Sequence, residues 1–256
     1  MKRFNRLTII LVLLGTAYTS LLAQQSATPA PDIEPAVMQA LNRMGAYIRA
    51  LKSYQVTAEI TTEEVLDDGQ KLQFARNVNI VARMPDRLLA EIDGDILKRL
   101  YVYDGKTFTG AALRAGYYAT VAAPPSIGEL VDFVNKFDID LPLVDLFLWG
   151  GPRSDTKAIR SAVDVGPGRV AGVSCQHYAL RQPGLDWQIW IQLGDHPLPR
   201  KLVLTTTDDE ARPQFSAIIN WNLAPSFGEG TFTFVPPPGV VKAVFSGDKA
   251  PVGKKK

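Results

Sequence analysis

Apolar residues recur at steps of three or four where the folded part of the chain begins. This period places them on one face of an α-helix, with polar residues on the opposite face. The apolar positions are Ile33, Val37, Leu41, Met44, Ile48 and Leu51. Asp32 precedes the run and is a candidate N-cap. The pattern predicts an amphipathic helix over residues 32–54.

From Tyr54 onward the period changes to two. Apolar and polar residues alternate in short segments, as in an antiparallel sheet with one buried face. Turn sequences such as Asp67-Asp68-Gly69 and Gly166-Pro167-Gly168 separate neighbouring segments. The predicted strands are residues 54–63, 72–82, 88–92, 100–103, 106–113, 162–165, 169–180, 187–193, 201–207, 215–223 and 230–238. The fold class is therefore mainly β (α+β), with about eleven strands in one sheet.

The alternation breaks off between residues 119 and 149. Ser126 and Glu129 have the spacing of a capping box, and helical spacing follows, so we expect a helix over residues 126–137. A second helix is predicted over residues 140–149 and is apolar almost all round. A helix of that kind is buried or covers an apolar surface.

One face of the predicted sheet is too apolar to be left in water. Its large side chains include Trp187, Ile189, Ile191, Phe215, Ile219 and Trp221. The three predicted helices are the candidates to cover this face, with residues 124–151 as a lid. The space beneath them is either filled by side chains or open to an apolar ligand. Periodicity alone leaves both possibilities open.

The first residues have the features of a secretory signal peptide. Residues 1–6 are basic, an apolar run follows, and Ala23 precedes a polar stretch. We expect cleavage after Ala23, a linker over residues 24–31 and a periplasmic location without a stable membrane span; an uncleaved anchor is the alternative. Cleavage removes three basic residues and no acidic one, which changes the net charge from +2 to about −1. Residues 246–256 are predicted to be a basic, disordered tail.

The composition leaves little material for catalysis or metal binding. The chain has one cysteine, Cys175, and two histidines, His177 and His196. Cys175 and His177 lie two residues apart without an orienting acid, so we interpret them as packed strand residues. Asp195 and His196 are neighbours on an extended segment and point to opposite faces, as expected of a surface turn. We predict no enzyme activity, no cofactor and no metal, and the near-neutral charge argues against nucleic acid.

Four segments resemble, in order, motifs of the periplasmic lipoprotein carriers of the LolA/LolB type. They are residues 51–56 (LKSYQV), 83–88 (RMPDRL), 103–107 (YDGKT) and 231–240 (TFTFVPPPGV). The chain is more closely similar to an uncharacterised group of predicted periplasmic proteins that is thought to share that fold. The resemblance spans residues 32–245. It implies a single domain, an incomplete and strongly curved antiparallel β-barrel with a helical lid and a hydrophobic cavity for acyl chains.

Pattern and resemblance together predict a non-enzymatic periplasmic protein that binds or carries an apolar ligand, such as an acyl chain, a lipid or a lipidated protein. The residues expected in the cavity and lid are Val56, Ile60, Phe74, Ile80, Ile127, Leu130, Val134, Leu146, Phe147, Trp149, Trp187, Ile189, Phe215, Ile219 and Trp221. The resemblance also implies a lid-gating arginine directly before the first proline of residues 83–88. Met84 occupies that position here, and Arg83 is the nearest match. An offset of one residue on a strand turns a side chain to the opposite face, so the direction of Arg83 stays open.

Two other function classes stay open at the level of sequence. The first is an interaction module with a filled core and no ligand, for example in envelope sensing. Such a module would use an edge strand or the outer face to bind a transient envelope protein. The second is an enzyme, for which His177 and His196 would be the residues to test.

Overall fold

The structure is a computed structural model that describes residues 33–139, 141–151, 154 and 156–244. These residues belong to one unit, residues 31–256. The expected signal peptide, linker and basic tail lie outside the described residues, as does Asp32. No helix in the described part of the chain is both long and apolar enough to cross a membrane.

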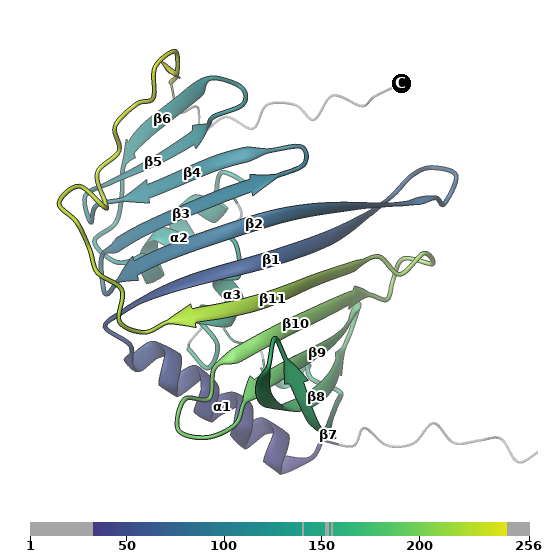
Figure 1. Cartoon of the computed structure of the whole chain (residues 1–256). Helices are drawn as coiled ribbons and strands as arrows, with labels where there is room; N and C mark the ends of the chain where they lie inside the picture. Colours follow the sequence, from purple (N-terminus) through teal and green to yellow (C-terminus); the bar gives the residue numbers. More distant parts are fainter. Residues whose placement is uncertain (1–32, 140, 152–153, 155, 245–256) are drawn as a thin grey trace, which may run out of the picture. The chain divides into compact units, whose positions relative to one another are not determined.

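The alternating segments form a single sheet of twelve strands. The strands are β1 (Ser53–Val65), β2 (Lys71–Arg83), β3 (Arg87–Gly94), β4 (Lys98–Tyr103), β5 (Thr107–Ala112), β6 (Tyr117–Ala122), β7 (Ser161–Val170), β8 (Val173–Gln182), β9 (Leu185–Gln192), β10 (Pro199–Thr206), β11 (Gln214–Asn222) and β12 (Val241–Lys242). Their order in the sheet is β12-β6-β5-β4-β3-β2-β1-β11-β10-β9-β8-β7 (Figure 1). Two consecutive antiparallel series, β1 to β6 and β7 to β11, are therefore joined by the pairing of β1 with β11.

The sheet is mainly antiparallel and open, as the sequence predicts. Its edges are β7 and β12, and they do not pair with each other. The pairing of β12 with β6 is parallel and short. At the centre, Val56 lies opposite Ile80 on one side and Trp221 on the other, so the apolar residues of neighbouring strands share one face.

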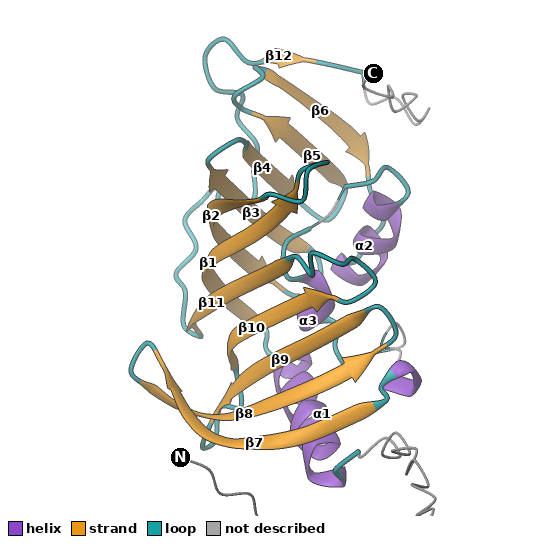
Figure 2. Cartoon of the chain, turned by 90° about the vertical axis from the view of Figure 1, so that its right-hand side faces the viewer, coloured by secondary structure: helices purple, strands orange, loops and turns teal. Residues whose placement is uncertain are grey.

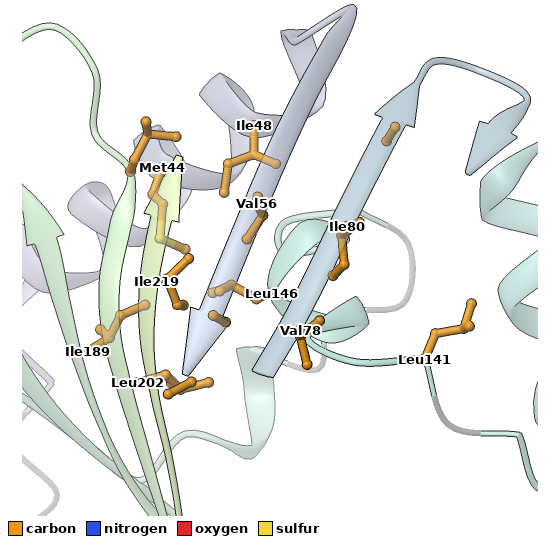
Figure 3. Packing of buried hydrophobic residues seen from close by; sticks show 14 of the residues in the cluster. Met44, Ile48, Val56, Val78, Ile80, Leu141, Leu146, Ile189, Leu202 and Ile219 are labelled. Atoms are coloured by element: carbon orange, nitrogen blue, oxygen red, sulfur yellow. The ribbon is translucent and has the colours of Figure 1, made fainter. Parts of the chain in front are cut away.

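Three α-helices lie on this apolar face of the sheet (Figure 2). They are α1 (Pro35–Ala50), α2 (Ile127–Asn135) and α3 (Val144–Phe147), with a short 3₁₀ helix, η1 (Thr156–Ala158), after them. The segment that carries α2, α3 and η1 leads from β6, near one edge of the sheet, to β7 at the other. We call this segment, residues 123–160, the crossover. Figure 3 shows Met44 and Ile48 of α1 and Leu146 of α3 facing the strand residues Val56 and Ile219.

The helix predictions are confirmed in position and corrected in length. Residues 32–54 contain α1, which ends at Ala50 because β1 begins at Ser53. The N-cap of α2 is Ser126, whose hydroxyl oxygen accepts a hydrogen bond of 3.3 Å from the Glu129 amide. The predicted helix over residues 140–149 is much too long, because only four residues are α-helical. Leu143 has a left-handed backbone conformation, with φ of 59°, which prevents helical continuation toward Pro142.

Two strand predictions are wrong, and one strand was missed. β6 was not predicted from the sequence. Gly166, Pro167 and Gly168 lie inside β7, where the register shifts after Asp164. The turn itself falls at Ala171-Gly172, where both residues have positive φ, 46° and 82°. Residues 230–238 form no strand of the sheet, and β12 follows them instead.

Candidate functional site

The crossover leaves a first apolar cavity of about 280 Å³ between α2, the end of α1 and strands β2 and β3. Its wall comes from elements that the sheet order and the crossover bring together. The lining residues are Ile48, Arg49, Tyr54, Ile80, Met84, Leu88, Ala90, Ile127, Gly128, Val131, Leu141, Pro142, Val144, Phe147 and Leu148. Most of this wall is aliphatic or aromatic, so the space suits an apolar chain rather than a polar molecule.

Two of these lining residues carry polar side-chain groups. Tyr54 is almost fully buried between α3 and the sheet, and this burial raises the pKa of its hydroxyl to about 12. Arg49 is exposed at the end of α1. Its guanidinium donates a hydrogen bond to the main-chain carbonyl of Trp149, just after α3. Arg49 therefore links α1 to the crossover at the edge of the first cavity.

A second cavity, of about 320 Å³, lies beneath α3 and η1 and above strands β8 to β10. Its lining residues are Asp145, Leu146, Leu148, Trp149, Ser154, Ala158, Gln182, Leu185, Trp187, Leu202 and Leu204. The rings of Trp149 and Trp187 meet edge to face, with centroids 5.4 Å apart. This cavity is also mainly apolar, and it has two tryptophans in its wall.

α3 separates the two cavities. Leu148 lines both of them, Val144 and Phe147 line the first, and Asp145 and Leu146 line the second. The ring of Phe147 packs against Tyr54 and Trp221, with centroid distances of 5.6 and 5.7 Å. A single helical turn of four residues thus forms the partition.

The crossover is attached to the rest of the fold at a few defined points. The Ile127 amide donates to the Pro85 carbonyl at 2.8 Å, and the Tyr103 hydroxyl donates to the Pro124 carbonyl. At the other end, the backbone of Trp149 approaches α1 closely at Gly45, where a side chain would overlap the Trp149 carbonyl oxygen. This close approach accounts for a glycine in the middle of α1, where alanine would favour the helix by about 1 kcal/mol.

The residues predicted for the cavity and lid divide into three groups. Ile80, Ile127 and Phe147 line the first cavity, and Leu146, Trp149 and Trp187 line the second. A second group belongs to the packed core or its margin: Val56, Ile60, Leu130, Val134, Ile189, Ile219, Phe215 and Trp221. Phe74 is half-buried and lies outside that core cluster. The apolar face is therefore largely filled, and the cavities occupy only the part beneath the crossover.

Several lining residues were not among the predicted site residues. Leu88 and Ala90 alternate on β3 and face the first cavity. Their alternation in the sequence already predicted that they lie on the apolar face. Tyr54 and Met84 stand at strand ends, where alternation gives little guidance. Ile48 belongs to the predicted apolar face of α1. Its place in a cavity wall follows from the position of α2, which no sequence pattern shows.

The side chain of Arg83 lies away from both cavities. Its guanidinium carbon is 5.5 Å from the centre of the Phe232 ring, in the segment that follows β11. Met84, one residue later, lines the first cavity. The alternation of β2 continues into the turn, so the arginine and the methionine point to opposite faces.

The histidines and the cysteine have structural contacts. His177 stacks on Trp190 with centroids 3.9 Å apart, and its Nε2 atom lies 3.0 Å from the Gln188 side-chain oxygen. Burial lowers the pKa of His177 and raises that of the Cys175 thiol. The Nδ1 atom of His196 is 2.6 Å from the Tyr47 hydroxyl of α1. Within the described ranges, no three His, Cys, Asp or Glu residues are grouped as metal ligands would be.

A family model and several solved structures are similar to this chain. The model described as "Predicted periplasmic protein (DUF2092)" matches residues 37–246. No curated protein matches the chain.

Three of the solved structures are similar over most of their length. LprF from Mycobacterium bovis is 14% identical with a TM-score of 0.48, covering 77% of this chain and 97% of that one. Lipoprotein LppX from Mycobacterium tuberculosis is 11% identical with a TM-score of 0.39, covering 75% and 98%. A LolA superfamily protein from Nitrosomonas europaea is 7% identical with a TM-score of 0.36, covering 77% and 97%. At this level of identity, the ligands of those proteins are not assigned to this chain.

Proposed function

The chain belongs to the family of predicted periplasmic proteins (DUF2092), and we propose that it is a non-enzymatic periplasmic protein that binds or carries an apolar ligand. The ligand is an acyl chain, a lipid or the lipid part of a lipidated protein. It occupies the two cavities beneath the crossover, with the residues that line them as the binding residues. Arg83 has no gating role in this proposal, because its side chain packs on Phe232.

The observation that carries this proposal is the pair of apolar cavities, of about 280 and 320 Å³, in an otherwise packed core. Concave, mainly apolar pockets of this size that open at the surface are typical of small-molecule binding sites. An apolar chain in these spaces would gain about 25 cal/mol for each Å² of apolar surface removed from water, before ordering costs are subtracted. Burial of an acyl chain is therefore the most favourable use of this space.

Both spaces are partly open at the surface, and movement of the crossover would widen the entrance for a long ligand. α2 and α3 are short, and the crossover contains Pro124-Pro125 before α2 and Gly150-Gly151 after α3. Movement of the four-residue partition would join the two cavities into one. Short segments that cover a binding site and are bounded by proline or glycine commonly act as lids.

Gly128 offers a direct test of the proposal. It lines the first cavity, and a Cβ atom placed on it would meet no atom within 4 Å. Gly128→Leu therefore has room for its Cβ atom and adds an apolar side chain at the wall of the cavity. The delipidated wild-type protein should retain palmitate in native mass spectrometry, and Gly128→Leu should reduce the bound fraction at least about fivefold.

Gly128→Ala is the matched control, because it favours the helix in the same way but adds only one methyl group. It should bind palmitate as the wild type does. Absence of palmitate and of every other acyl chain from the wild-type protein would remove the proposal. Equal binding by Gly128→Leu would show that the first cavity is not the site.

The second candidate function is an interaction module with a filled core. It is favoured by the packing of Val56, Ile60, Ile189 and Ile219, which fill much of the apolar face with side chains. In that case the outer face of the sheet would bind a protein partner. The absence of acyl chain binding in the experiment above would favour this function.

A further inference from the structure

The first cavity meets solvent at a charged side chain. Arg49 lines this cavity and is the one residue of the described lining that is exposed. The other residues of that lining are buried or half-buried, and none of them carries a charge. A long arginine stem lies along apolar surface while its guanidinium reaches water. The place where this cavity opens therefore carries a positive charge.

The guanidinium of Arg49 is held between α1 and the end of α3. Its Nη1 group donates to the main-chain carbonyl of Trp149. A Cβ atom on Gly45 would lie 2.9 Å from Nη1, and a Cβ atom on Gly150 would lie 2.7 Å from it. Because both positions are glycine, the guanidinium has room between the two elements. Its position is thus fixed by main-chain groups on both sides.

Two nitrogens of this guanidinium remain for another partner. An arginine side chain has five N–H donors, and the contact of Arg49 with Trp149 involves Nη1. Nε and Nη2 together form a planar fork that binds a carboxylate or a phosphate through two parallel hydrogen bonds. Arg181 shows this geometry in the same chain, because its Nε and Nη2 donate to the two carboxylate oxygens of Asp186 at 2.6 and 2.9 Å.

The acidic residues of α2 have contacts of their own. The carboxylate of Glu129 accepts a hydrogen bond from the Ser126 hydroxyl at 3.2 Å. Asp132, one turn after Gly128, is exposed and takes part in a separate interaction. Neither acid is in the described lining of the first cavity.

The second cavity differs in charge from the first. Its described lining includes the acid Asp145, and Lys157 precedes the lining residue Ala158 in the chain. Charges of both signs therefore lie at or beside that wall. The first cavity, with Arg49 as the charged residue of its described lining, is the better place for an anionic group.

We propose that the first cavity binds the chain of an anionic amphiphile, whose carboxylate or phosphate accepts two hydrogen bonds from Nε and Nη2 of Arg49. This inference rests on the proposed function and names the chemical class of its ligand. The chain lies against apolar wall residues such as Ile48, Met84 and Leu88. The head group stays at the surface beside an exposed cation, so its charge is not moved into an apolar interior, which would be costly.

Three ligands with the same chain length and different head groups test this inference. They are dodecanoate, dodecyl phosphate and 1-dodecanol, each used below the concentration at which it forms micelles or separates from solution. In calorimetric titrations, the wild-type protein should bind at least one of the two anions about fivefold more tightly than dodecanol, as expected for a bidentate ion pair at the surface. The anion that binds more tightly identifies the ligand as a carboxylate or a phosphate. This preference should decrease as the salt concentration is raised.

Arg49→Gln removes the charge and the fork. It should lower the ratio of anion affinity to dodecanol affinity about fivefold, while dodecanol binding stays within about twofold of wild type. Any loosening of the crossover by this change would affect all three ligands, so the ratio reports the head group alone. Arg43→Gln is the matched control, because Arg43 is an exposed arginine of α1 outside the described lining of both cavities. It should keep the wild-type ratio.

The outcomes separate this inference from the proposed function. If dodecanol binds the wild-type protein as tightly as both anions do, the inference is overturned and apolar ligand binding remains. An unchanged ratio in Arg49→Gln also overturns it, as does an equal loss of the ratio in Arg43→Gln, which would indicate a general effect of surface charge. Failure to bind all three ligands, together with failure to retain palmitate, removes the proposed function itself.

Discussion

α1 and the crossover cover the same apolar sheet face in different ways. α1 is a helix of 16 residues, and Val37, Leu41 and Met44 on its inner face are completely buried. The crossover has two short helices, and the residues around them line two cavities. Of α1, only the last turn reaches a cavity, through Ile48 and Arg49. Leu130 and Val134 of α2 are also completely buried, so both covers contribute to the core, but most of the residues around the two cavities belong to the crossover and the sheet.

The largest expected difference between α1 and the crossover is in the unfolding free energy that is lost when a leucine is replaced by alanine. Leu41→Ala should destabilise the protein by about 3–4 kcal/mol, because it opens a cavity in a fully packed region. Leu148→Ala should cost only about 1–2 kcal/mol, because that half-buried side chain already borders empty space. Chemical denaturation monitored by circular dichroism gives both values. Equal costs would mean that the cavities beside Leu148 do not weaken its packing.

The same difference explains which elements could be predicted from the sequence. The period of α1 and of most strands was visible because each has one buried and one exposed face. β6 was missed because its burial does not alternate: its four inner residues are all half-buried and its two end residues are exposed. Val121 packs toward the core, and Tyr118 meets Phe234 on the other side with ring centroids 4.9 Å apart. Partial cover on both faces leaves no clear alternation of apolar and polar residues to identify the strand.

The strand predicted over residues 230–238 is wrong because an alternating pattern is present there without pairing in the sheet. Its alternating phenylalanines are real, but Phe232 and Phe234 pack onto side chains of β2 and β6 instead of extending the sheet. The three prolines from 236 to 238 have no N–H to donate to a neighbouring strand. The pattern identified six of the residues that line the cavities, but it could not show the cavities themselves. Their volumes depend on where the crossover lies above the sheet, and residues with the same pattern fill the core elsewhere.

Tyr54 lies where α1 and the crossover meet, and the pKa of its hydroxyl depends on its burial there. Burial raises the pKa of its hydroxyl to about 12, above the ordinary value near 10. The folded state therefore favours the protonated phenol. The resulting stability is fully present below pH 10 and is lost as the pH rises from 10 to 12, by about 2–3 kcal/mol in total.

Tyr54→Phe should remove this part of the pH dependence. Denaturation of both proteins at pH 9 and pH 11.5 measures the difference, and absorbance at 295 nm follows the phenolate in the wild type. A ligand that keeps the crossover closed should hold the pKa of Tyr54 high. A Tyr54 that titrates near pH 10 in the folded protein would place it in water and contradict its burial beneath α3.

The smallest expected effect, and the most specific to the contact between the two covers, comes from two glycines in helices. In α1, a methyl group on Gly45 would overlap the Trp149 carbonyl oxygen and approach the indole Cδ1 atom to 2.9 Å. In α2, a methyl group on Gly128 would meet nothing within 4 Å. Alanine favours both helices by up to about 1 kcal/mol, but overpacking at Gly45 costs about 1–3 kcal/mol. Gly45→Ala should therefore be less stable than the wild type by about 1 kcal/mol. Its hydrogen exchange should be faster only in the residues around α3. Gly128→Ala is the control and should be at least as stable as the wild type. Uniform loss of protection across the sheet in Gly45→Ala would mean that the crossover is part of the cooperative core. Loss confined to the crossover would mean that this segment can open while the sheet and α1 stay folded, which would widen the entrance for a long ligand.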